Sequence, residues 1–203
     1  MVGTATIRLM EDGRRLHLQH GPIDIVAEAF GSPTEIQAAY RQGGEAFQTV
    51  LGTLVEDLGI LRQPVDPDKP PVLRGIASQM WQATQPFARD HFVTSMAAVA
   101  GAVADHVKVA MLQGRKLNKL YVNNGGDIAL HLAGEAVFSG GIVENQDAPN
   151  LDSVFTLRPQ DRVAVLDMPA SDETILASKI AMHPKARAVV VAAEARGAAW
   201  AVQ

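Results

Sequence analysis

The stretch Leu120 to Leu132, LYVNNGGDIALHL, carries the strongest structural signal in this chain of 203 residues. Apolar residues alternate with polar ones on both sides of the segment NNGGD, which begins at Asn123. This alternation predicts two half-buried strands, and Asn and Gly between such runs are typical of a tight hairpin turn. The same glycines leave backbone N–H groups that an anionic ligand can approach closely. Both interpretations, a structural hairpin and a ligand-binding turn, follow from these residues.

The N-terminal region predicts further antiparallel strands and then a helix. Residues 7–18 alternate in polarity around Asp12-Gly13, which indicates a hairpin, and the apolar run 23–26 adds a third strand. The segment Ser32–Glu35 combines a capping serine, a proline at the first helical position and a capping-box glutamate. We therefore expect a helix to begin there and to bend or break at Gly43-Gly44.

A helix of unusually small residues is expected upstream of the opening stretch, from about Thr94 to Leu112. Its low side-chain bulk indicates that a sheet, another helix or a ligand approaches closely. Gly101 favours the same conclusion, because glycine costs roughly 1 kcal/mol relative to alanine inside a helix. Further along, apolar runs predict strands at 163–166 and 188–193, and a capping box predicts a helix from Ser171.

Composition limits the class of protein. Hydrophobic residues make up 47% and charged residues 20%, as in an ordinary folded domain, and the net charge is -4. Lys and Arg are scattered, which argues against a nucleic-acid partner. The absence of cysteine excludes disulfides, thiolate nucleophiles and Cys-based zinc sites. Because we find no signal-peptide pattern and no apolar stretch long enough to span a bilayer, we expect a cytoplasmic protein without a membrane partner.

Six residues form the ligand site expected from the sequence. Thr94 and Ser95 begin the small-residue helix, where hydroxyl groups cap a helix and free N–H groups bind anions. The other four form the glycine turn: Asn124, Gly125, Gly126 and Asp127. We find no histidine spacing typical of a metal site, no Walker loop and no nucleophile elbow, so the expected metal is none and no catalytic residue is assigned.

Residues 91–107, HFVTSMAAVAGAVADHV, and the opening stretch together resemble a small uncharacterised cytosolic branch of the ApbE-like superfamily. Better-known members of that superfamily are flavin transferases, which use FAD and magnesium to attach FMN to a threonine of a target protein. The resemblance implies one α+β domain over residues 1–203, an antiparallel sheet backed by helices in a tunnelling-fold architecture. Residues from about 154 to 203 diverge from the family pattern, so the resemblance does not extend to a magnesium site.

The resemblance therefore implies binding of FAD, FMN or a similar small anionic ligand near the glycine turn. One alternative is FAD-dependent FMN transfer. Another is a non-catalytic binding module, in which the small-residue helix packs the subunits of a homo-oligomer. Whether the chain is an enzyme stays open at this point.

Overall fold

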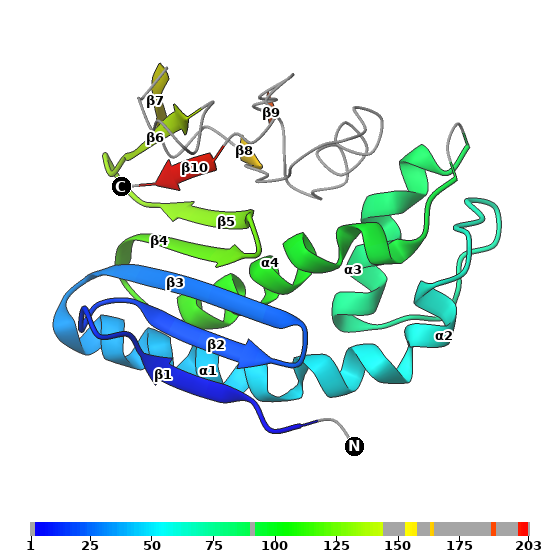
Figure 1. Ribbon diagram of the computed structural model, residues 1–203, viewed down its shortest axis with the longest axis horizontal. Coiled ribbons are helices and arrows are strands. Elements are labelled where there is room, and N and C mark those ends of the chain that lie inside the picture. Colours follow the sequence, from blue (N-terminus) through cyan, green and yellow to red (C-terminus); the bar gives the residue numbers. More distant parts are fainter. Residues whose placement is uncertain are drawn as a thin grey trace.

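The structure, a computed structural model, describes residues 3–89, 92–143, 153–157, 163–164, 188–189 and 199–202. It is an α+β fold built on a five-stranded antiparallel sheet of order β1-β2-β3-β4-β5 (Figure 1). The strands are β1 (Thr6–Leu9), β2 (Leu16–His20), β3 (Ile23–Gly31), β4 (Leu117–Asn124) and β5 (Asp127–Leu132). The described α-helices are α1 (Pro33–Glu56), α2 (Leu58–Leu61), α3 (Gly75–Thr84) and α4 (Val99–Leu112), with short 3-10 helices η1 (Gln85–Phe87) and η2 (Ser95–Ala98). The predicted α+β class, the antiparallel sheet and the three N-terminal strands are confirmed.

The later strands form two smaller sheets. One has the order β10-β6-β7, from β6 (Phe138–Val143), β7 (Ser153–Leu157) and β10 (Ala199–Val202). The other pairs β8 (Val163–Ala164) with β9 (Ala188–Val189) in parallel. These two short strands fall within the predicted strands 163–166 and 188–193, whose remaining residues lie outside the described part. The helix predicted from Ser171 also lies outside it.

The core forms where α1 and α4 cover one face of the five-stranded sheet (Figure 1). Every second residue of the central strands points into this core, as the period of a strand requires. The buried members of this face include Leu16, Leu18, Ile25, Ala27, Leu120 and Val122. The side chains between them lie on the opposite face of the sheet, and that face contributes to the pocket described below.

The pair Gly43-Gly44 does not bend α1, which runs unbroken from Pro33 to Glu56. A Cβ atom on Gly43 would lie 2.6 Å from Cγ of Met111, and one on Gly44 would lie 3.1 Å from Cγ2 of Ile7. The prediction of a bend was wrong, because the glycines allow α4 and β1 to pack closely against a straight helix.

Helix α4 contacts α1, α3, β4 and β5, so the close approach expected from its small residues is confirmed and comes from helices and sheet. The helix was expected to start at about Thr94. In the structure, Ser95–Ala98 forms a 3-10 turn, and the α-helix begins after it. Among the described residues, the helical segment Ser95–Leu112 is long and apolar enough to cross a membrane by length and composition. This is weak support for a membrane span, because over half of the segment is buried inside the fold.

The serine cap of α1 follows the sequence, whereas the carboxylate of Glu35 bonds to residues before β4 instead of completing the predicted capping box. Oγ of Ser32 accepts a hydrogen bond from the backbone N–H of Glu35 at 3.4 Å, as the capping pattern predicts. The Glu35 carboxylate accepts a hydrogen bond from the backbone N–H of Lys116 at 2.7 Å and lies 3.5 Å from Nη1 of Arg115. The first turn of α1 is therefore tied to the segment that leads into β4.

Candidate ligand-binding pocket

The glycine turn closes the β4–β5 hairpin. Gly125 and Gly126 have φ angles of 59° and 100°, the positive values that a two-residue hairpin turn requires. The backbone N–H of Gly126 donates to Oδ1 of Asn123 at 2.8 Å, so this group of the turn is already bonded within the protein. The structural interpretation of the turn is confirmed, while its binding of an anion stays a prediction.

The structure brings the two sequence motifs together. Nδ2 of Asn124 donates to the carbonyl oxygen of Ala100 at 3.0 Å, which joins the turn to the beginning of α4. Thr94 pairs with Pro64 in an isolated β-bridge, Ser95 is buried in the first turn of η2, and Asp127 begins β5. Across the residues that the structure describes, no group of three or more His, Asp or Glu side chains is placed to hold a metal.

A different place in the fold forms a pocket of about 520 Å³. It lies where β3 continues past its last pair with β2, Leu16 opposite Ala27, and where the β1–β2 hairpin turn approaches α1. Its apolar lining includes Leu9, Phe30, Pro33 and Ile36, and its polar lining includes Arg14, Glu28, Gln37 and Tyr40. None of the six residues expected from the sequence lines this pocket.

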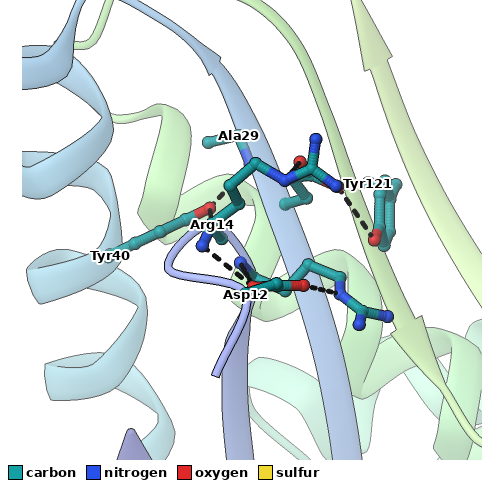
Figure 2. A network of polar contacts seen from close by, with 7 residues as sticks. Asp12, Arg14, Ala29, Tyr40 and Tyr121 are labelled. Atoms are coloured by element: carbon teal, nitrogen blue, oxygen red, sulfur yellow. Dashed lines mark hydrogen bonds and ion pairs between the residues drawn. The ribbon is translucent and has the colours of Figure 1, made fainter. Parts of the chain in front are cut away.

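Tyr40 joins the three elements around the pocket. Its hydroxyl accepts a hydrogen bond from the backbone N–H of Ala29 at 3.1 Å and donates to the carbonyl oxygen of Arg14 (Figure 2). Ala29 lies beyond the part of β3 that β2 covers, so the phenol from α1 supplies a partner there. Burial raises the pKa of Tyr40, which keeps the hydroxyl protonated and able to make both bonds.

Glu28 is the nearly buried charge of the pocket, with 9% of its surface exposed. Its Oε1 lies 3.7 Å from Nε of Arg14, and its Oε2 accepts a hydrogen bond of 3.3 Å from the hydroxyl of Tyr121. Both distances are long for such contacts. Burial, with the negative charge of Glu28 next, raises the pKa of Tyr121 to about 12, so Tyr121 remains a donor.

The hairpin turn holds Arg14 at the rim of the pocket. Oδ1 of Asp12 accepts hydrogen bonds from the backbone N–H groups of Arg14 at 2.9 Å and Arg15 at 3.0 Å (Figure 2). These backbone bonds, with the side chain of Arg15 next, hold the pKa of Asp12 far below its usual value. The carboxylate therefore stays ionised and the turn keeps its shape over the ordinary pH range.

A family model described as AbpE bacteria matches residues 7–168, which include all of the five-stranded sheet except Thr6 of β1, and all of these pocket residues. The chain belongs to this family. No protein of curated function matches the sequence.

Membership of the AbpE bacteria family corrects the resemblance drawn from the two motifs. The matching family is not that of the ApbE-like flavin transferases, so the assignment to that superfamily was wrong. The glycines of LYVNNGGDIALHL are accounted for by the hairpin turn between β4 and β5, and the small residues of α4 by its contacts with helices and sheet.

The pocket of this AbpE bacteria member contains residues that the sequence interpretation missed. Arg14 and Glu28 lie in segments that read as a turn and a strand, and Tyr40 lies in a helix. One signal was present, because Glu28 is a charged residue inside the apolar run Val26–Phe30. Its partners come from other elements, so no local pattern indicated that they would meet.

Proposed function

We propose that the chain binds a small organic molecule in the pocket beside Glu28. The apolar body of the ligand contacts Leu9, Phe30 and Ile36, and an anionic group of the ligand lies at the guanidinium of Arg14. The observation that carries the proposal is a pocket of about 520 Å³ that joins an apolar wall to a few convergent polar groups. This volume and this composition are typical of small-molecule sites.

The phenols around the pocket act as hydrogen-bond donors. Tyr40, which lines the pocket, and Tyr121, which bonds to Glu28, have raised pKa values, so both stay protonated near neutral pH. We therefore propose a binding protein whose tyrosines hold the pocket and the carboxylate in position.

Ligand-induced stabilisation tests the proposal, with a panel of small carboxylates and phosphates that carry aromatic or aliphatic bodies. A ligand at about a hundred times its Kd adds about 2.7 kcal/mol to the free energy of unfolding. Gln37→Trp places a large side chain at the exposed edge of the pocket, whereas Gln48→Trp makes the same change on the same helix, at a residue that does not line it. We expect the wild type and Gln48→Trp to gain equal thermal stability from a ligand, and Gln37→Trp to gain little. A response of Gln37→Trp equal to that of the wild type would count against this pocket.

A second site stays a proposal from the sequence: an anionic ligand, such as FAD or FMN, at Asn124–Asp127 with Thr94 and Ser95. The hydrogen bond from Asn124 to Ala100 favours it, because it places the turn beside the start of α4. The visible absorbance spectrum of the purified protein tests it, since a bound flavin is coloured. A colourless protein that gains no thermal stability from FAD or FMN would contradict it. FMN transfer is not proposed, because its basis was the superfamily assignment that the family match corrects.

The finer architectural expectations also remain proposals. A tunnelling-type arrangement is supported by the antiparallel sheet with helices on one face. A homo-oligomer packed through the small-residue helix rests on the sequence pattern alone. Light scattering in solution would measure the mass of the assembly, and a monomeric mass would contradict the oligomer. Cytoplasmic location without membrane or nucleic-acid partners is tested by cell fractionation.

A further inference from the structure

We infer that the ligand of the pocket is a zwitterion, whose ammonium group donates to Glu28 and whose carboxylate accepts from Arg14. This inference rests on the proposed function of the same pocket and names the chemical class of its ligand. It follows from the hydrogen bonds and ion pairs that the polar groups of the pocket already make within the protein.

Glu28 is the hydrogen-bond acceptor in the pocket that a donor group of a ligand can bind most favourably. The hydroxyl of Tyr40 already accepts one hydrogen bond and donates another, from Ala29 and to Arg14. Glu28 has only 9% of its surface exposed, yet the contacts to its two oxygens measure 3.7 and 3.3 Å. A nearly buried carboxylate is costly unless it is closely paired. An ammonium group would make a shorter charge-assisted bond, of about 2.7–2.9 Å.

Arg14 provides the complementary charge at the opening of the pocket. Its side chain is 72% exposed, and the nitrogen nearest to Glu28 is Nε. A guanidinium carries five N–H donors in a planar fork that suits a carboxylate. The exposure of the side chain leaves its outer face accessible to a ligand from solvent.

The two charges together select against singly charged ligands. A simple anion at Arg14 would stand near the like charge of Glu28, and a simple cation at Glu28 would stand near Arg14, because the two side chains are 3.7 Å apart. A zwitterion places each of its charges beside the opposite one. Its apolar body then lies against Phe30, Leu9 and Ile36, which line the same pocket.

Isothermal titration calorimetry with three probes of one shape tests the inference. L-phenylalanine carries both charges, 3-phenylpropionate lacks the ammonium group and phenethylamine lacks the carboxylate. We expect phenylalanine to bind the wild type at least about tenfold more tightly than either analogue, as befits one further charged hydrogen bond.

The variant Glu28→Gln removes the charge and keeps the size of the side chain and an oxygen for Tyr121. We expect it to weaken phenylalanine binding about tenfold and to leave 3-phenylpropionate unchanged or tighter. Glu45→Gln is the matched control, because Glu45 is an exposed residue of α1 that pairs with Arg41 away from the pocket. It should change neither affinity. Circular dichroism of both variants checks that they are folded.

The outcomes separate this inference from the proposed function. Equal binding of phenylalanine and 3-phenylpropionate, or an equal loss of both in Glu28→Gln, would overturn the zwitterion and leave small-molecule binding in place. The zwitterion is also overturned, and small-molecule binding remains, if none of the three probes binds while members of the carboxylate and phosphate panel stabilise the protein. If neither set binds, the inference and the proposed function both fail.

Discussion

At the scale of single residues, Tyr121 and Glu28 show how burial sets the chemistry of the pocket. The phenol is half-buried beside a carboxylate, and both conditions disfavour its ionised form. The result is a neutral donor next to a charged acceptor. This arrangement makes a specific prediction about alkaline pH.

Tyr121 should ionise at a pKa of about 12, above the ordinary value of 10.0. Because the folded value is the higher one, the unfolded chain loses the proton first as pH rises. The contribution to stability is therefore complete below about pH 10 and is lost as pH rises toward about 12. Spectrophotometric titration of tyrosinate in the wild type and in Tyr121→Phe measures the pKa of Tyr121, which is obtained from the difference between the two curves. If the difference between the two titration curves corresponds to one phenol with a pKa near the ordinary value of 10.0, the prediction is contradicted.

At the scale of elements, α1 shows that similar glycines in one helix have different physical roles. Gly43 faces Met111 of α4 at a distance that leaves no room for a Cβ atom, whereas nothing lies within 4 Å of the corresponding position on Gly52. The helical period predicted the helix but not the neighbour that each glycine meets. The bend expected at Gly43-Gly44 was wrong for this reason.

Gly52→Ala should stabilise the protein by about 0.5–1 kcal/mol, because alanine restricts the unfolded chain and favours the helix. Gly43→Ala gains the same propensity but forces the buried Met111 to move, and overpacking of this kind costs about 1–3 kcal/mol. We expect a net loss for Gly43→Ala. Urea unfolding of the pair measures both, and equal stabilisation by the two substitutions would show that α1 and α4 are not in close contact at Gly43.

At the scale of the whole molecule, one tie connects parts of the chain that are distant in sequence. The carboxylate of Glu35, in the first turn of α1, holds the backbone of Lys116 and the side chain of Arg115 just before β4. This contact fixes α1 relative to the sheet, and the wall that α1 contributes to the pocket depends on that placement.

Glu35→Ala should lower the free energy of unfolding by about 1–3 kcal/mol, since it leaves a backbone donor without its charged acceptor. Glu45→Ala removes a surface ion pair on the same helix and should change stability by less than about 0.5 kcal/mol. Denaturant unfolding of the two variants gives the comparison. An effect at Glu35 no larger than that at Glu45 would mean that the tie to Lys116 contributes little.

The sequence by itself determined what depends on near neighbours along the chain. Alternation around Asp12-Gly13 and around the glycine turn predicted both hairpins, and Ser32 with Pro33 predicted the start of α1. Period, turn chemistry and capping act over a few residues, so they can be read from one segment at a time.

Only the tertiary structure decided where the candidate pocket lies. It gathers Arg14 from a turn, Glu28 from a strand and Tyr40 from a helix, while the glycine motif that stood out in the sequence closes a hairpin elsewhere. A pocket depends on which elements end beside one another, here on β3 extending past β2 and on α1 being held by Glu35. Contacts between distant residues have no period or local pattern, because packing of the whole chain brings them together.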